Sequence, residues 1–259
     1  NLSKELAKPT FFNNTTASKH DQFAITTTDK AVAGNYIVEV QKLAQPQTLT
    51  TQASITNQTE KLGTPGSIDR SITITAGDPQ KEVKIPLSDD QTSLVEMRDA
   101  INNAKAGVNA SIMRVADNDY QLAISSTATG EKNTISVQVN NDDKLGAILN
   151  YDPTAKSNAM KQTVAGQDAE VLVNGTKIKR STNSIADALQ GVTIDLKTVT
   201  KKDEPQNLVI STDKTGTADK IKSWVDNYNS LLDTFNSLTK YTPVKTGEAQ
   251  NAKNGALLG

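Results

Sequence analysis

The chain has 259 residues, of which 36% are hydrophobic and 4% aromatic, and its formal net charge is −1. This length allows two domains, each with its own core. The near-zero net charge gives no basic surface for binding nucleic acid, and the sequence has no apolar run of about 18 residues that would insert into a membrane. The absence of cysteine excludes disulfides, thiolate metal sites and cysteine nucleophiles.

The N-terminal part of the chain is mostly polar and contains the first predicted strands. Residues 1–20 are irregular and indicate a loop or an edge segment. Alternating apolar and polar residues over 22–43 predict two strands around a turn at Gly34 and Asn35. The Gly- and Pro-containing stretch KLGTPGS at 61–67 marks a first boundary.

A compact block over residues 67–150 follows. The turn cluster AGDPQ separates two alternating segments and therefore predicts a β-hairpin. The polar sequence ADND separates two more. Alternation predicts strands over residues 68–75, 82–87, 108–112, 120–124 and 135–139.

The same block contains a predicted helix with a recognisable start and end. Ser93 and Glu96 have the spacing of a capping box, in which the hydroxyl and the carboxylate satisfy two backbone amides. Gly107 stands where a left-handed residue would end the helix before a strand begins. The apolar stripe of this helix consists of Leu94, Met97, Ile101 and Ala104.

Residues 151–215 begin with a polar connector and then return to strand patterns. Asn174 and Gly175 lie between alternating segments, which is a strong hairpin signal. The stretch NSIADALQGVTIDL resembles the earlier helix and strand, with Gly191 in the place of Gly107. These patterns predict an α+β fold with mostly antiparallel sheets.

From residue 216 onward, apolar residues follow helical spacing. Asp219 is expected in the first turn, near the positive end of the helix dipole, and Pro243 is expected to end the helix. The seam is either ordinary helix core or a surface that meets another protein or subunit. Because the chain has no second long helix and begins with Asn1 rather than Met, we expect its natural termini, and the partner of this helix, to be missing. The seam consists of Ile221, Trp224, Tyr228, Leu231, Phe235 and Leu238.

No catalytic, cofactor or metal site is predicted, and we expect that the chain is not an enzyme. His20 is the only histidine, and no motif serine lies near it in the sequence. The segment from Asp117 begins like a Ca²⁺-binding loop, but Leu122 and Ala128 stand where Gly and Glu are needed. Glycine-rich phosphate loops are also absent from the sequence.

Several segments, in this order, resemble the bacterial flagellar cap protein family, also called the hook-associated protein 2 family. They include GNYIVEVQKLAQPQTL, AINNAKAGVNASI and DAEVLVNGTKI, followed by STNSIADALQGVTIDL and IKSWVDNYNSLLDTFNSLTKY. Ile101 and Asn102, with Gly107 and Val108, resemble the IN motif of flagellar axial proteins. The resemblance covers most of residues 20–242.

The resemblance implies a protein with a helical leg and two β-rich head domains, one inserted into the other. Gly107 and Gly191 are then structural residues of a repeated helix-to-strand unit, and Asn174 and Gly175 are structural residues of a hairpin turn. The family's terminal coiled-coil segments are absent from this chain. The implied division is residues 1–19 as part of the leg or linker, 20–66 with 151–215 as the first head domain, 67–150 as the inserted second head domain, and 216–259 as the leg helix and tail.

The resemblance also implies a function. The family forms a ring, described as a pentamer, at the distal end of the flagellar filament, where exported flagellin folds and is added. Expected partners are other copies of the chain, flagellin, the hook–filament junction protein and mucin or host surfaces, and the expected location is extracellular. The alternatives are a flagellar adhesin or binding module and a related junction protein.

Overall fold

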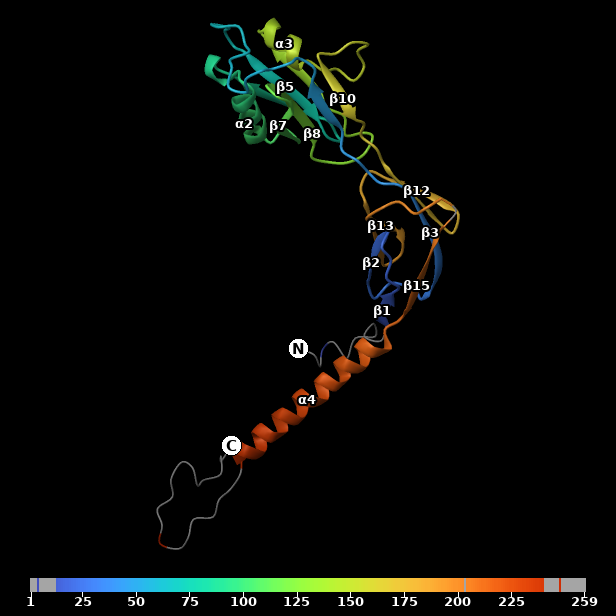
Figure 1. Cartoon of the computed structure of the whole chain (residues 1–259). Coiled ribbons are helices and arrows are strands. Elements are labelled where there is room, and N and C mark those ends of the chain that lie inside the picture. The colour runs from blue at the N-terminus through green and yellow to red at the C-terminus, as the bar shows by residue number, and fades with distance from the viewer. Residues whose placement is uncertain (1–3, 5–12, 203, 240–246, 248–259) are drawn as a thin grey trace.

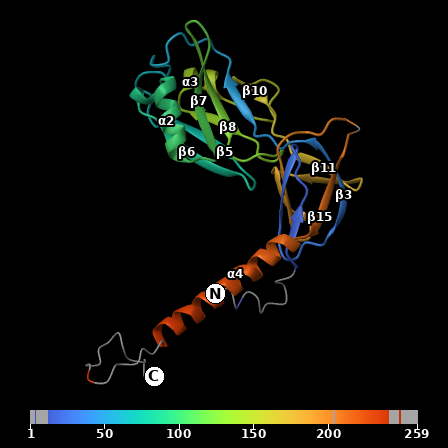
Figure 2. The same cartoon turned by 60° about the horizontal axis from the view of Figure 1, so that its bottom comes forward.

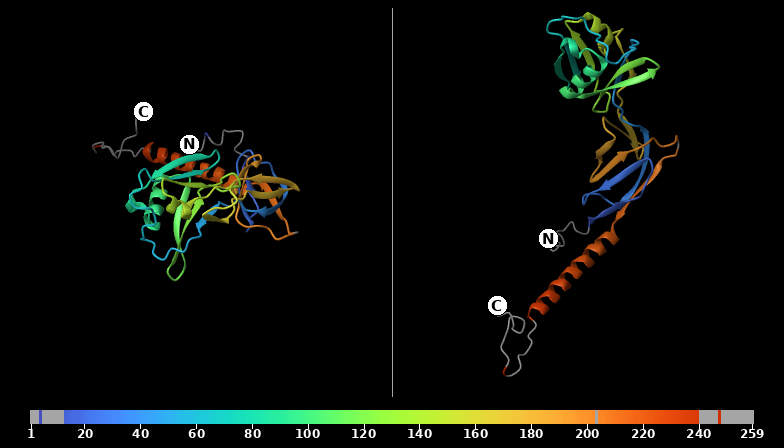
Figure 3. Two further views of the ribbon diagram at one scale, coloured as in Figure 1. Left: turned by 90° about the horizontal axis from the view of Figure 1, so that it is seen from above. Right: turned by 60° about the vertical axis from the view of Figure 1, so that its left-hand side comes forward.

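The computed structural model describes residues 4, 13–202, 204–239 and 247. It is elongated and bent, and its three parts follow one another (Figure 1). A long helix leads from a β-rich body, here called the proximal unit, and a second β-rich body, the distal unit, lies at the opposite end. Views from other directions show the same succession (Figures 2 and 3). Each unit has its own hydrophobic core.

The proximal unit consists of two antiparallel sheets that enclose a core of Phe23, Val38, Val171, Ile194 and Leu208 with their neighbours. One sheet has the order β1 (Thr15–Ala17), β15 (Gln206–Thr212), β3 (Gly34–Lys42), β11 (Ala169–Val173) and β12 (Thr176–Arg180). The other has the order β13 (Ser184–Leu189), β14 (Val192–Leu196) and β2 (Phe23–Thr27).

The distal unit combines two antiparallel sheets with short helices. One sheet has the order β10 (Met160–Val164), β4 (Thr48–Thr51), β8 (Asp119–Ser126) and β7 (Val108–Ala116), and the other has the order β6 (Lys81–Pro86), β5 (Ser71–Ala76) and β9 (Ser136–Asn140). The helices are η2 (Asp89–Gln91), α2 (Leu94–Ala104) and α3 (Asp143–Leu149). The α+β class with antiparallel sheets is confirmed.

The distal core is assembled from one continuous stretch of chain, whereas the proximal core takes residues from both sides of it. Strands β4 and β10 lie outside residues 67–150, yet they pair with each other, and β4 also pairs with β8. The predicted boundaries are therefore too narrow. The reason is that polar residues, which indicated a connector, make up most of these short strands: Thr50 and Thr51 are buried in β4, and Lys161, Gln162 and Thr163 are exposed in β10. We propose boundaries near residues 44 and 166.

Other local predictions need correction. Strands β2 and β3 exist, but they belong to different sheets, and Gly34 and Asn35 begin β3 instead of forming a turn. Helix α3 was not predicted, because it has only seven residues and includes Gly146. Its start was visible as Asp142, whose carboxylate accepts a hydrogen bond from the Leu145 amide at 3.1 Å.

Helix α2 begins where predicted, with Ser93 accepting a hydrogen bond from the Glu96 amide, but the Glu96 carboxylate lies 3.3 Å from Lys61 Nζ and does not complete the predicted capping box. The end of the helix differs from the prediction. Lys105, not Gly107, is the left-handed residue that follows the helix (φ 49°), and Gly107 (φ +72°) lies just before β7. Ile101 is buried, and the neighbouring Asn102 side chain donates to the Ala110 carbonyl at 2.9 Å and accepts from the Ala110 amide at 2.7 Å. Asn102 thus joins the helix to β7.

The Asn102→Ala substitution is expected to lower the free energy of unfolding of the distal unit by about 1–3 kcal/mol, because both Ala110 backbone groups lose their partner. Urea unfolding followed by circular dichroism measures the change. Asn103→Ala is the matched control, since Asn103 is exposed on the same helix and should change little. An equal loss in both variants would contradict a specific role for Asn102.

The second predicted helix-to-strand unit is wrong. Residues 184–196 form a hairpin of β13 and β14 with Gly191 in the turn (φ +73°). Ile185 and Leu189 are spaced as on a helix, but both pair across the hairpin, and β14 continues the sheet to β2. A short apolar run does not distinguish helix from strand, and sheet pairing decided the outcome here. The Asn174–Gly175 hairpin is present, with φ 49° and +78°.

The Gly191→Ala substitution is expected to be clearly more destabilising than Gly175→Ala. Both glycines have positive φ, so either substitution introduces backbone strain of about 1 kcal/mol or more. A Cβ at Gly191 would also lie 2.5 Å from the Ala31 nitrogen, whereas nothing lies within 4 Å of a Cβ at Gly175. Comparison of the two melting temperatures tests this, and equal losses would show that the contact with Ala31 adds nothing.

Candidate interaction surface

The long helix α4 (Lys214–Thr239) leaves the proximal unit directly after β15. It begins two residues earlier than predicted, so Asp219 lies beyond its first turn. Asp213 caps it instead: its carboxylate accepts a hydrogen bond from the Gly216 amide at 2.8 Å, and its carbonyl accepts from Thr217. The Asp-Lys-Thr-Gly sequence contained this signal. Pro243 lies outside the described residues.

The seam residues lie on α4 as predicted, and none of them is buried. The Trp224 and Tyr228 rings stack, with centroids 5.6 Å apart. Seven large apolar residues of α4 are exposed, with exposed fractions of 39% for Ile221, 40% for Val225, 49% for Tyr228, 51% for Leu231, 42% for Leu232, 56% for Phe235 and 53% for Leu238. An apolar stripe this long on an exposed helix indicates a surface for another helix or subunit.

Val225 and Leu232 belong to this stripe and were missed in the sequence. They follow Trp224 and Leu231 and widen the seam from two positions per heptad to three. Three apolar positions per heptad are typical of a helix that packs inside a bundle, whereas a two-stranded coiled coil needs only two. The stripe face of α4, defined as Ile221, Trp224, Val225, Tyr228, Leu231, Leu232, Phe235 and Leu238, is therefore the candidate functional site.

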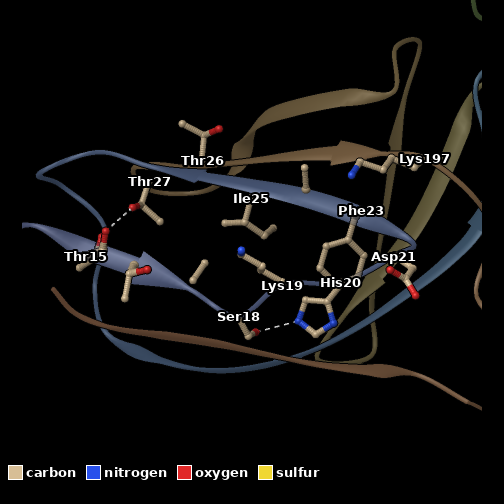
Figure 4. Close-up of a pocket in the computed structure, with 13 residues that line it drawn as sticks. Thr15, Ser18, Lys19, His20, Asp21, Phe23, Ile25, Thr26, Thr27 and Lys197 are labelled. Carbon is tan, nitrogen blue, oxygen red and sulfur yellow. Dashed lines mark hydrogen bonds between the residues drawn. The ribbon is translucent and has the colours of Figure 1, made fainter. Parts of the chain in front are cut away.

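A second candidate is an open cavity of about 580 Å³ between β1 and β2 (Figure 4). Here the structure brings Ser18 Oγ within 2.7 Å of His20 Nε2, a contact not predicted because the two residues are in an irregular segment. Ser18 Oγ also accepts a hydrogen bond from the Val209 amide, and the His20 ring stacks on Phe23 at 4.6 Å. This pair therefore fastens β1 to β15, which is a structural role.

The described residues contain no cluster of three or more His, Asp or Glu side chains placed to hold a metal ion. Within the same residues, no helix is long and apolar enough to cross a membrane. The stripe face of α4 is therefore the candidate site whose role is sought by comparison with known proteins.

Residues 166–259 match the family model described as flagellar hook-associated protein 2 C-terminus, and residues 71–128 match the flagellin hook IN motif. The crystal structure of the D2–D3 domains of the flagellar cap protein from Serratia marcescens is 74% identical, with a TM-score of 0.72, over 74% of this chain and 100% of that one. The chain belongs to the flagellar hook-associated protein 2 family.

Longer relatives agree with this membership. The D1–D2–D3 structure of the Escherichia coli flagellar cap protein is 40% identical, with a TM-score of 0.84, and the match covers 93% of this chain and 66% of that one. Flagellar hook-associated protein 2 from E. coli K12 is 43% identical over 98% of this chain and 54% of its own length. The chain spans just over half the length of the curated relatives it matches.

Membership in the hook-associated protein 2 family confirms the resemblance and the expected extracellular location on the flagellum. The names of these relatives describe a structural component of the flagellum. The IN motif match includes Ile101 and Asn102, so the contact of Asn102 with β7 gives this motif a physical role in the distal unit. The match to the family C-terminus includes all of α4.

Proposed function

We propose that the chain is the head and part of the leg of a filament cap. In this proposal, copies of the full-length protein form a ring at the distal end of the flagellar filament, where flagellin folds and is added and from which it is not lost. The role is structural and involves no catalysis. The observation that carries the proposal is the unburied stripe face of α4, in a chain related to flagellar cap proteins.

The exposed stripe face supports assembly through the helical part of the protein. Fully burying a Leu or Phe side chain contributes about 1.5–3 kcal/mol, so eight stripe residues provide ample free energy for packing against other helices. We propose that these helices belong to the parts of the longer relatives that this chain does not cover and to neighbouring copies. Because most of the stability of helices in proteins comes from packing of the amphipathic face, the stripe face is a further reason for such packing.

The two β-rich units support the division into head domains. We propose that the proximal unit is the first head domain and that the distal unit is inserted into it, because both crossings of the chain between them are near residues 44 and 166. The head then projects away from the helical leg (Figure 1). The pentameric state, flagellin binding and contacts with the junction protein or mucin remain predictions from the resemblance.

Restoration of filaments is the test of this function. The full-length parent protein is purified and added to cells that export flagellin but have no cap. Electron microscopy then counts filaments, and free flagellin in the medium is measured. The proposal predicts new filaments and less free flagellin. If folded protein leaves flagellin monomeric, the cap function is rejected, and binding of the two β-rich units to mucin would instead favour the adhesin.

A further inference from the structure

The junction between the proximal and distal units contains a third contact besides the two chain crossings. We propose that the loop of residues 127–133, here called the latch loop, locks the angle between the two units by docking on the proximal unit. This inference does not depend on the cap function. It assigns the latch loop a role in fixing the conformation, beyond that of connecting β8 to β9.

The two crossings alone form a narrow ribbon. Gln45 and Gln167 pair as an isolated antiparallel bridge, with N–O distances of 2.8 and 3.0 Å in the two directions. A two-stranded ribbon without further support is only marginally stable, and relative motion is the default expectation for domains joined by a small interface. The ribbon would therefore act as a hinge.

The latch loop adds contacts away from the ribbon axis. Thr129 Oγ1 donates to the Ser181 carbonyl at 2.5 Å, and the Glu131 amide donates to Asp168 Oδ1 at 2.8 Å. Lys179 Nζ lies 2.7 Å from Glu131 Oε2 and 3.6 Å from Asp168 Oδ2. These partners lie in β12, in the turn that follows it and just before β11, all in the proximal unit. Rotation about the ribbon would break them.

The shape of the joint shows close docking. Gly130 has φ +110°, and a Cβ on it would lie 2.6 Å from Ser181 Cβ. A Cβ on Gly166 would lie 2.8 Å from the Gly130 carbonyl oxygen. Both glycines thus allow backbones from the two units to approach more closely than other residues permit. The Gly130 amide also donates to the Gln45 carbonyl at 3.1 Å, which links the latch loop to the ribbon.

The latch loop is itself held in shape by the distal unit. Asn133 is only 7% exposed, and its side chain donates to the Thr129 carbonyl at 2.6 Å. Thr127 Oγ1 donates to the Gly107 carbonyl, and the Ser126 amide donates to Gln47. A braced loop loses little entropy on docking, so its contacts can restrict the hinge efficiently.

The test measures the distance between the units in solution. Because the chain has no cysteine, Lys144→Cys on α3 and Asn207→Cys on β15 place one spin label on an exposed position of each unit. Pulsed electron paramagnetic resonance gives the distribution of the label separation. A locked joint predicts one narrow distribution for the 259-residue chain.

Two variants open the latch differently. Gly130→Val inserts a side chain where no space exists, and the double substitution Thr129→Ala with Asp168→Ala removes side-chain contacts without a clash. Both are expected to broaden the distribution by about twofold or more, with circular dichroism unchanged. Thr154→Ala, which loses a hydrogen bond to Asp152 within the distal unit and away from the latch loop, is the matched control and should keep the narrow distribution.

The width of the distance distribution decides whether the latch loop locks the angle between the units. A broad distribution in the parent chain would show that the loop does not lock the joint. A narrow distribution in the folded Thr129→Ala/Asp168→Ala variant would show that the side-chain contacts of Thr129 and Asp168 do not lock the angle between the units. Should Gly130→Val fail to fold, the double variant still decides between the two.

Discussion

Replacing Leu231 and Leu238 with Asp in the full-length protein is expected to abolish ring assembly while both β-rich units stay folded. The two leucines lie one heptad apart on the stripe face, 51% and 53% exposed. Loss of their burial removes about 3–6 kcal/mol, and two charges would have to enter an apolar interface. That corresponds to a decrease in the association constant of more than about a hundredfold. Native mass spectrometry or analytical ultracentrifugation measures the oligomer.

Ser230→Asp with Ser237→Asp is the matched control. These serines are the sequence neighbours of the leucines, but lie on the opposite side of α4, so the same two charges are added to the same part of the helix. The control variant should assemble as the parent does. If it fails to the same degree as the leucine variant, added charge rather than the stripe face is responsible, and the interface must be sought elsewhere.

The second large effect is expected for Arg70→Ala, at about 3–5 kcal/mol of unfolding free energy in the distal unit. Arg70 and Asp142 side chains are 1% and 0% exposed, and Arg70 Nε lies 2.7 Å from Asp142 Oδ2. Arg70 also contacts Asp89 at 2.9 Å and donates to the Thr64 carbonyl. Removing the guanidinium leaves the Asp142 carboxylate buried without its cation, which is more costly than losing an exposed pair. Urea unfolding followed by circular dichroism measures the loss.

Arg98→Ala provides the comparison, because the Arg98–Asp99 pair is 35% and 55% exposed and should contribute about 1 kcal/mol or less. A similar small loss for Arg70→Ala would mean that water or rearranged side chains replace the guanidinium, and that the buried pair does not hold the segment around Thr64 against α3.

The same cluster predicts a loss of stability in acid. Burial by itself would raise the pKa of Asp142, but the amides of Leu145 and Thr64 and the guanidinium of Arg70 outweigh it and lower that pKa below 3.8. The Gly66 amide and Arg70 likewise lower the pKa of Asp89. Since the folded-state values are depressed, this stabilisation is complete above about pH 4 and decreases as pH falls through the folded-state pKa values.

Melting temperatures between pH 5 and pH 2.5 test this direction. The parent should lose more stability over that range than Asp142→Asn, which has no carboxylate to protonate at this position, although the variant is less stable at pH 7. Parallel curves for the two proteins would show that Asp142 does not contribute to the acid sensitivity.

Local signals in the sequence predicted the elements whose ends are fixed by short-range chemistry. Ser93 marked the start of α2, and Asn174 with Gly175 marked a hairpin, because capping and positive φ depend on only a few neighbouring residues. The heptad spacing of α4 also identified most of its stripe face. Only the structure could show that none of the stripe residues is buried.

The incorrect predictions share another cause, which is that they depend on pairing between distant parts of the chain. Strand β14 of the hairpin over residues 184–196 pairs with β2, which is more than 150 residues away in the sequence, so local apolar spacing could not distinguish a hairpin from a helix. Likewise, β4 and β10 are polar strands recognisable only through their pairing. The docking of the latch loop could not be predicted either, because Asp168 and Lys179 meet Glu131 through tertiary packing alone.

The position of the protein on the filament tests the proposed cap most directly. The full-length protein with Lys144→Cys on its distal unit, labelled with maleimide-gold, is supplied to cells that lack a cap, and the filaments are imaged by electron microscopy. The cap proposal predicts gold at the free end of each filament. Gold at the base of the filament would identify a junction protein instead, and gold along its length or on filament-free surfaces would contradict the cap proposal.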